Sequence, residues 1–93
     1  MYKVILLPEA EKSYRKLSSS DRSSRREPNG HFHRVAQALE SIKENPFQGK
    51  PLKHKLKGQF SFRVGVYRII YTVEKQKITV YILDIGHRRE IYR

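Results

Sequence analysis

The chain has 93 residues, with 20 Lys and Arg against 9 Asp and Glu, a formal net charge of +11 at pH 7, no cysteine and 38% hydrophobic residues. This length and composition predict one domain spanning residues 1–93 with a single modest core, and they exclude stabilisation by disulfides. No stretch has the roughly 20 apolar residues of a membrane span, so we expect a cytoplasmic protein. The high positive charge predicts a polyanionic partner, nucleic acid rather than membrane.

The N-terminal third predicts a strand followed by a helix. Residues 2–7 are apolar and partly β-branched, and Pro8 ends the strand and begins a helix with acids in its first turn. The apolar stripe of this helix is Ala10, Tyr14 and Leu17. Residues 18–30 contain no apolar side chain and end on Pro28, Asn29 and Gly30, which predicts a flexible connection.

A second helix and several strands follow. Phe32, Val35, Leu39 and Ile42 recur at helical spacing, and Asn45 and Pro46 end that helix after Glu44. Beyond a loop, the pattern predicts strands at 53–56, 60–64, 67–73 and 78–85. The fold class is therefore α+β: an N-terminal strand, a helical hairpin, and an antiparallel sheet of three to four strands with the helices on one face.

The turn residues also predict the strand register. Gly65–Val66 fits a two-residue type II′ loop, so Val64 faces Tyr67 and Arg63 faces Arg68. Alternation then places the apolar partners on a core face and the two arginines on an open face. A second turn centred on Lys75–Gln76 would place Ile69 opposite Ile82 and Arg68 opposite Leu83, in a central strand with the helices on the Ile82 side.

The predicted Arg63–Arg68 pair is the first candidate functional feature. Like charges directly opposite each other destabilise a sheet, and a bound phosphate would offset that cost because the guanidinium group makes bidentate contacts. The basic charge is concentrated here: residues 50–93 carry eleven basic and three acidic side chains, net +8, against net +3 for residues 1–49. The alternative is that both arginines extend into solvent or pair with Glu90.

The C-terminal tail leaves the predicted sheet at the same end. His87 titrates near neutrality and could transfer a proton, while Arg88 could stabilise charge on phosphate and Tyr92 could stack on a base. The alternative is that His87 is an ordinary surface histidine. Further candidate RNA-binding residues are Lys53, Lys55, Lys57, Ser61 and Arg89. No metal motif, phosphate loop or dinucleotide fingerprint is present, so no cofactor is expected.

These motifs together resemble a known family. The runs are YRIIY at 67–71, GHRREIY at 86–92, and the proline, glycine and basic pattern at 46–58, and they are similar to the RelE/ParE superfamily of toxins, its RelE-like branch above all. The resemblance covers nearly the whole chain. It implies a toxin that enters the ribosomal A site and cuts mRNA without metal, by attack of a ribose 2′-hydroxyl on the adjacent phosphate.

The resemblance also assigns roles residue by residue. Arg68 would stabilise the scissile phosphate, Arg88 would serve the leaving side, Tyr92 would orient a base, and Arg63 stands where relatives use a basic residue. Some relatives have two lysines where this chain has Ser61 and Arg63. Because arginine hardly deprotonates, His87 is the natural candidate for the general base. The 18–30 connection is also long for the helical hairpin of this family.

Two other functions are compatible with the same fold. One is a ParE-like toxin that poisons DNA gyrase by binding, and the other is an inactive member that only binds an antitoxin or RNA. The resemblance implies a protein partner in either toxin reading, an antitoxin that wraps the toxin in a hetero-oligomer. An antitoxin that neutralises a charge of +11 should be acidic.

Overall fold

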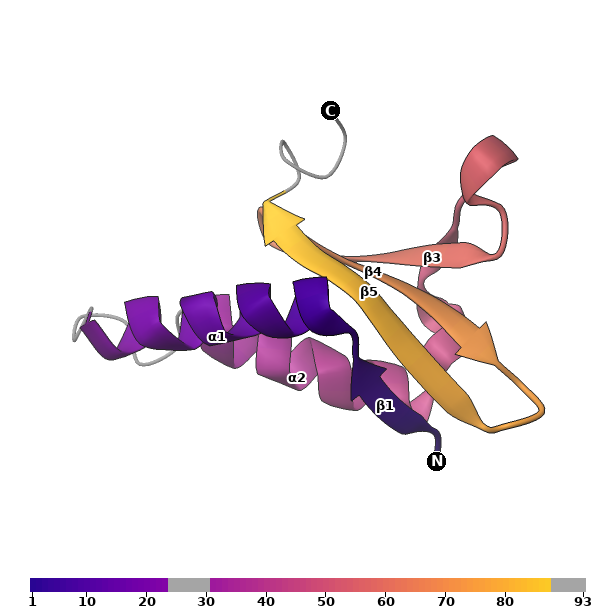
Figure 1. The fold of residues 1–93 in the computed structure, drawn as a ribbon, viewed down its shortest axis with the longest axis horizontal. Helices are drawn as coiled ribbons and strands as arrows, with labels where there is room; N and C mark the ends of the chain where they lie inside the picture. The colour runs from indigo at the N-terminus through magenta and orange to yellow at the C-terminus, as the bar shows by residue number, and fades with distance from the viewer. Residues whose placement is uncertain (24–30, 88–93) are drawn as a thin grey trace.

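The computed structural model describes residues 1–23 and 31–87, in which two helices pack on one face of a mixed sheet (Figure 1). The five strands are ordered β1-β5-β4-β3-β2. The helices are α1 (Pro8–Ser23) and α2 (His31–Glu44), and the strands are β1 (Lys3–Leu6), β2 (Lys50–Pro51), β3 (Gln59–Val64), β4 (Tyr67–Glu74) and β5 (Thr79–His87). The predicted α+β architecture is confirmed. The sheet is larger than predicted, because β1 joins it parallel to β5 and β2 extends its other edge.

Helix α1 begins at Pro8 as predicted but continues to Ser23, six residues past the end of its apolar stripe at Leu17. The prediction of a flexible connection from residue 18 is therefore wrong for 18–23. Lack of apolar side chains does not stop a helix: once a helix has formed, each further residue adds a backbone hydrogen bond, and residues 18–23 contain no proline or glycine. Residues 24–30 of the predicted connection lie outside the described residues.

The core lies between the helices and the sheet. Ala10 and Leu17 of α1 are buried, and Tyr14 packs on Phe32 of α2 with ring centroids 5.0 Å apart. The predicted second helix is confirmed, and its stripe is buried against the apolar side chains of β4 and β5. The buried residues of these three elements on the core side of the sheet are Val35, Ala38, Leu39, Ile42, Ile69, Tyr71, Val80, Ile82 and Ile85.

The β3–β4 hairpin has the predicted register at all six pairs, including Val64 with Tyr67 and Arg63 with Arg68. Gly65 has a φ of 60°, which a side chain would disfavour and which a type II′ turn requires at its first central residue. The prediction that the second face is open is wrong in its middle, where Ser61 and Ile70 are only 4% and 7% exposed. One cause is visible in the sheet, since the side chain of Arg68 reaches across to Ser61.

The β4–β5 register differs from the prediction. Ile69 lies opposite Ile85 instead of Ile82, and Arg68 lies opposite Gly86 instead of Leu83. The turn is one reason, because Glu74 pairs with Thr79 and leaves a four-residue loop. The other is a bulge after Ile70, where the pairing shifts by one residue. The predicted central position of this strand is confirmed, as is the helix side of the sheet, where Ile82 is fully buried.

The predicted strand at 53–56 is also wrong. His54–Leu56 forms a short 3₁₀ helix (η2), and the edge strand lies earlier, at Lys50–Pro51. The cause is chain reversal: the backbone N–H of Leu52 donates to the carbonyl of Gln59 at 2.9 Å, so residues 53–58 must form the loop between two antiparallel partners. The alternating lysines in this segment therefore lie on a turn.

A buried polar group fixes the loop after α2 to the sheet. Tyr71 has no exposed surface; its hydroxyl donates to the carbonyl of Pro46 at 2.7 Å and accepts from the N–H of Gly49 at 3.2 Å, and its ring stacks on Phe60 at 5.4 Å. We call these four residues the Tyr71 cluster. Burial raises the pKa of Tyr71 above its ordinary value of about 10, while the hydrogen bond from Gly49 acts in the opposite direction. In the described part of the chain no helix has the length and apolar character needed to cross a membrane.

Candidate nucleic-acid interface

Arg63 and Arg68 form a cross-strand pair beside the Gly65 turn, as the sequence predicted. Arg63 is exposed and Arg68 is half-buried. The Nη1 atom of Arg68 donates to the hydroxyl of Ser61 at 3.3 Å, which holds the guanidinium over the sheet. A guanidinium group held in this way is well suited to bind a phosphate, since a preorganised donor loses little freedom when the anion arrives. We call residues 63–68 the hairpin tip.

The last strand ends at the hairpin tip (Figure 1). Gly86 lies opposite Arg68, and the backbone of His87 lies opposite Tyr67. The prediction that β5 leaves the sheet beside the Gly65 turn is therefore confirmed for the backbone. The side chain of His87 and the whole of Arg88, Arg89 and Tyr92 lie outside the described residues, so their part in the site stays a prediction.

The predicted lysines lie on the loop between β2 and β3. Lys53, Lys55 and Lys57 are all exposed there, around η2. Sequence reasoning missed a fourth, Lys50, which is exposed on β2 directly opposite Ser61. The proline after Lys50 was read as part of a loop, and pairing of so short an edge strand has no signal in the sequence pattern. Lys50 therefore adds a basic side chain to the face that carries the arginine pair.

One acid also lies on this face. Asp84 of β5 pairs with Ile70 of β4, whose other neighbour is Ser61. Its Oδ1 atom accepts from the backbone N–H of Ile85 at 2.8 Å, and the side chain is partly buried. Sequence reasoning missed Asp84 because the predicted register placed Leu83 beside Arg68. Among residues 1–23 and 31–87, no three His, Cys, Asp or Glu side chains gather closely enough to hold a metal ion.

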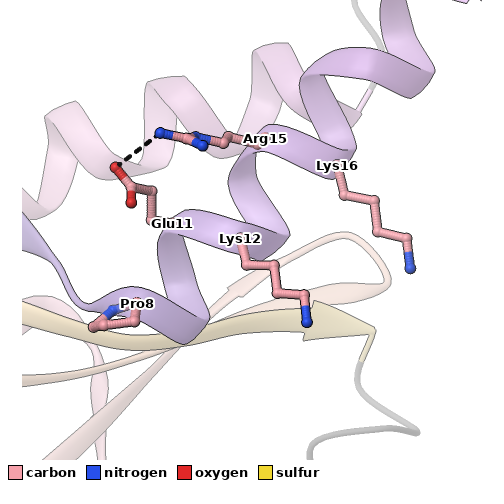
Figure 2. Close-up of a pocket in the computed structure, with 5 residues that line it drawn as sticks. All are labelled: Pro8, Glu11, Lys12, Arg15 and Lys16. Carbon is pink, nitrogen blue, oxygen red and sulfur yellow. Dashed lines mark ion pairs between the residues drawn. The ribbon is translucent and has the colours of Figure 1, made fainter.

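An open depression lies away from this face, on α1 (Figure 2). It is lined by Pro8, Glu11, Lys12, Arg15 and Lys16, and all five residues are exposed. Figure 2 shows Lys12 and Lys16 extending to the same side of the helix, while Arg15 pairs with Glu11 at 3.7 Å. Three of the five side chains are basic and one is acidic, so the depression adds positive charge to the helix side of the molecule.

Comparisons with known proteins agree with this geometry. A family model described as the ParE toxin of type II toxin–antitoxin system, parDE, matches residues 4–92. The toxin RelG of Mycobacterium tuberculosis is 49% identical over 45 residues, a match that spans about half of each protein, 48% of this chain and 52% of RelG.

Solved structures extend the likeness to the whole fold. The structure of the RelBE2 toxin–antitoxin complex of Mycobacterium tuberculosis contains a chain that is 31% identical, with 94% of this chain and 98% of that chain covered and a TM-score of 0.74. A chain of the intact Escherichia coli RelBE toxin–antitoxin complex is 20% identical over 94% of this chain and 96% of its own, with a TM-score of 0.68, and supports the fold alone.

The two helices on a five-stranded mixed sheet match the fold of the RelE-like class of α+β toxins. This chain belongs to the ParE toxin family of type II toxin–antitoxin systems, within the RelE/ParE superfamily. The resemblance that the sequence motifs indicated is confirmed.

Proposed function

We propose that this toxin is an endoribonuclease that cleaves mRNA in the A site of the ribosome, in the cytoplasm and without metal. The observation that carries the proposal is the cross-strand pair of Arg63 and Arg68, with Arg68 held by Ser61 at the end of the sheet where β5 also ends. Like charges directly opposite each other destabilise a sheet, and a phosphate bound between them would offset that cost.

The chemistry needs charge stabilisation on the phosphate and the transfer of two protons. The ribose 2′ oxygen forms a bond to phosphorus while the bond from phosphorus to the 5′ oxygen breaks, so a proton leaves the 2′-hydroxyl and another reaches the 5′ oxygen. Arg68, with Arg63, would stabilise the negative charge that develops on the phosphate oxygens. His87 would take or give a proton, Arg88 would serve the leaving oxygen, and Tyr92 would stack on a base.

A cleavage assay tests this proposal directly. Purified protein is added to ribosomes that hold a defined mRNA, and primer extension maps the cut positions with and without ribosomes. We expect cuts at A-site codons only when ribosomes are present, undiminished by a chelator that leaves the ribosomes intact. No cutting, with ribosomes known to carry mRNA, would count against the nuclease.

The description of the matching family model favours a second candidate, a ParE-like toxin that acts on DNA gyrase by binding. The fold does not separate this toxin from the nuclease, because function lies in the site. A supercoiling assay with purified gyrase distinguishes the two. Inhibition of gyrase without mRNA cleavage would favour the ParE-like function, and inactivity in both assays would favour a module that only binds RNA or an antitoxin.

The partner we propose is an acidic antitoxin that forms a hetero-oligomer with this chain. Two of the solved structures that resemble it are toxin–antitoxin complexes, and its own charge is +11. A partner with net negative charge would bind through electrostatic complementarity as well as by burial of apolar surface. Co-purification with the product of the neighbouring reading frame tests this pairing, and a basic product or no complex would contradict it.

A further inference from the structure

A third arginine approaches the hairpin tip from the helix side of the sheet. The Nη1 atom of Arg34 on α2 lies 3.6 Å from the position that a Cβ atom on Gly65 would take. Gly65 is in the turn that joins Arg63 to Arg68, whose side chains lie on the other face by strand alternation. Guanidinium groups from three elements, α2, β3 and β4, therefore reach the same end of the sheet from both faces.

The charge of Arg34 has no compensation within the described chain. Arg34 is exposed, and within residues 1–23 and 31–87 no acidic side chain lies at ion-pair distance from it. The first turn of α2 also contains no acid, so Arg34 adds positive charge close to the positive end of the helix dipole. Within the described residues no acid offsets this positive charge, and a polyanion that passes the tip would interact with it favourably.

We propose that Arg34 binds a phosphate of the substrate RNA that neighbours the one held by Arg63 and Arg68. This inference rests on the proposed nuclease function. Arg34 lies across the hairpin from Arg68, so the two would hold successive phosphates of one strand, which carries a charge on every nucleotide. Arg34 would be a positioning residue: it would bind the strand equally well before and during the reaction, and would act on KM more than on kcat.

The test compares Arg34→Ala with a matched control, Arg15→Ala. Arg15 is an exposed arginine on α1, and its ion pair with Glu11 is solvent-exposed and contributes little. For Arg34→Ala we expect KM for ribosome-bound mRNA to rise roughly tenfold with kcat within about threefold, and the slope of log K against log salt to decrease by about one. Arg34→Lys should restore part of the loss, because it returns a point charge without the planar fork.

A second measurement separates this inference from the nuclease function. Binding of a short, labelled single-stranded RNA is followed by fluorescence anisotropy, which does not require cleavage. Weaker RNA binding by Arg34→Ala than by Arg15→Ala supports the contact, whether or not the wild type cleaves RNA. A wild type that does not cleave would refute the nuclease function alone. Equal binding and equal KM in the two variants would overturn the role of Arg34 while cleavage by the wild type stands. Arg34→Gln repeats the comparison if alanine lowers the melting temperature.

Discussion

The hairpin tip and the Tyr71 cluster both include residues of β3 and β4, but their polar groups are placed in opposite ways. The Tyr71 hydroxyl is buried and has both a donor and an acceptor partner within the chain. Arg63 and Arg68 instead place two positive charges opposite each other at the surface end of β3 and β4. The Tyr71 cluster can be explained by folding alone, whereas the hairpin tip places like charges opposite each other, an arrangement that a bound anion would stabilise. Substitutions in the two regions should therefore affect different measurements.

Arg68→Ala should give the largest effect on activity. Loss of one preorganised charge donor typically costs two to three orders of magnitude, so we expect cleavage to decrease by about 10² to 10³ with antitoxin binding and the melting temperature nearly unchanged. The measurement is the cleavage rate beside a thermal melt of the same sample. A large loss of stability would show that the arginine belongs to the fold, and full toxicity in cells would remove it from the site.

His87→Gln tests the proposed proton-transfer role of His87. Glutamine keeps a hydrogen-bonding group but does not titrate near neutrality, so a general acid or base at this position should lose roughly a hundredfold in rate and one limb of the pH–rate profile. The profile is measured on ribosome-bound mRNA between pH values that keep ribosomes intact. An unchanged rate and profile would leave the arginines and Tyr92 to act by positioning and electrostatics alone.

Substitutions in the Tyr71 cluster should lower the stability of the protein and leave cleavage unchanged. Tyr71→Phe leaves two buried backbone groups without their hydrogen-bond partner, so we expect the free energy of unfolding to fall by about 1–3 kcal/mol. Gly49→Ala should also destabilise the protein, because an added Cβ would clash with the Tyr71 hydroxyl, although the φ of Gly49, −72°, suits alanine.

A double-mutant cycle sharpens this point. In the Tyr71→Phe background the hydroxyl is gone, so Gly49→Ala should cost less than it does in the wild type. Urea titration of the four proteins gives the coupling energy, and cleavage by each at a temperature where all are folded is the control. Additive losses, or a loss of cleavage as large as that of Arg68→Ala, would contradict the separation of the two regions.

The smallest expected effect is a change in the stability of the protein at alkaline pH. Because burial raises the pKa of Tyr71, the folded state keeps its proton where the unfolded chain, with a pKa of about 10, has lost it. The contribution of Tyr71 to stability is therefore fully present below about pH 10 and is lost as the pH rises through the higher pKa of the folded state. Between about pH 9 and pH 11, stability should decline less in Tyr71→Phe than in the wild type. Equal declines would assign the effect to Tyr14, whose pKa is also raised by burial and by Glu40.

Local turn chemistry explains which parts of the fold the sequence could predict. Gly65 allows a tight turn with a two-residue loop, and a register fixed at one turn holds along the whole β3–β4 pair. The β4–β5 register was not predictable in the same way, because the loop that ends with Ile78, at a φ of 49°, has no glycine to mark its length. The bulge after Ile70 also depends on how β5 meets the core, which alternation along one strand does not encode.

The candidate site was predictable only where it depended on the local turn. The Arg63–Arg68 pair followed from the turn, while Lys50, Asp84 and Arg34 join the region through an edge strand, a bulge and a helix position. Each of these depends on tertiary packing. The arginine pair could be picked out as a candidate site because like charges on adjacent strands destabilise a sheet, and such conflicts are expected at functional sites.

The parallel pairing of β1 with β5 has a consequence for synthesis. Lys3–Leu6 is translated long before Thr79–His87, its neighbour in the sheet. At roughly 5–20 residues per second, the N-terminal strand must wait several seconds for its partner. The nascent chain therefore cannot close its core, or bring Gly86 beside Arg68, until β5 has been translated.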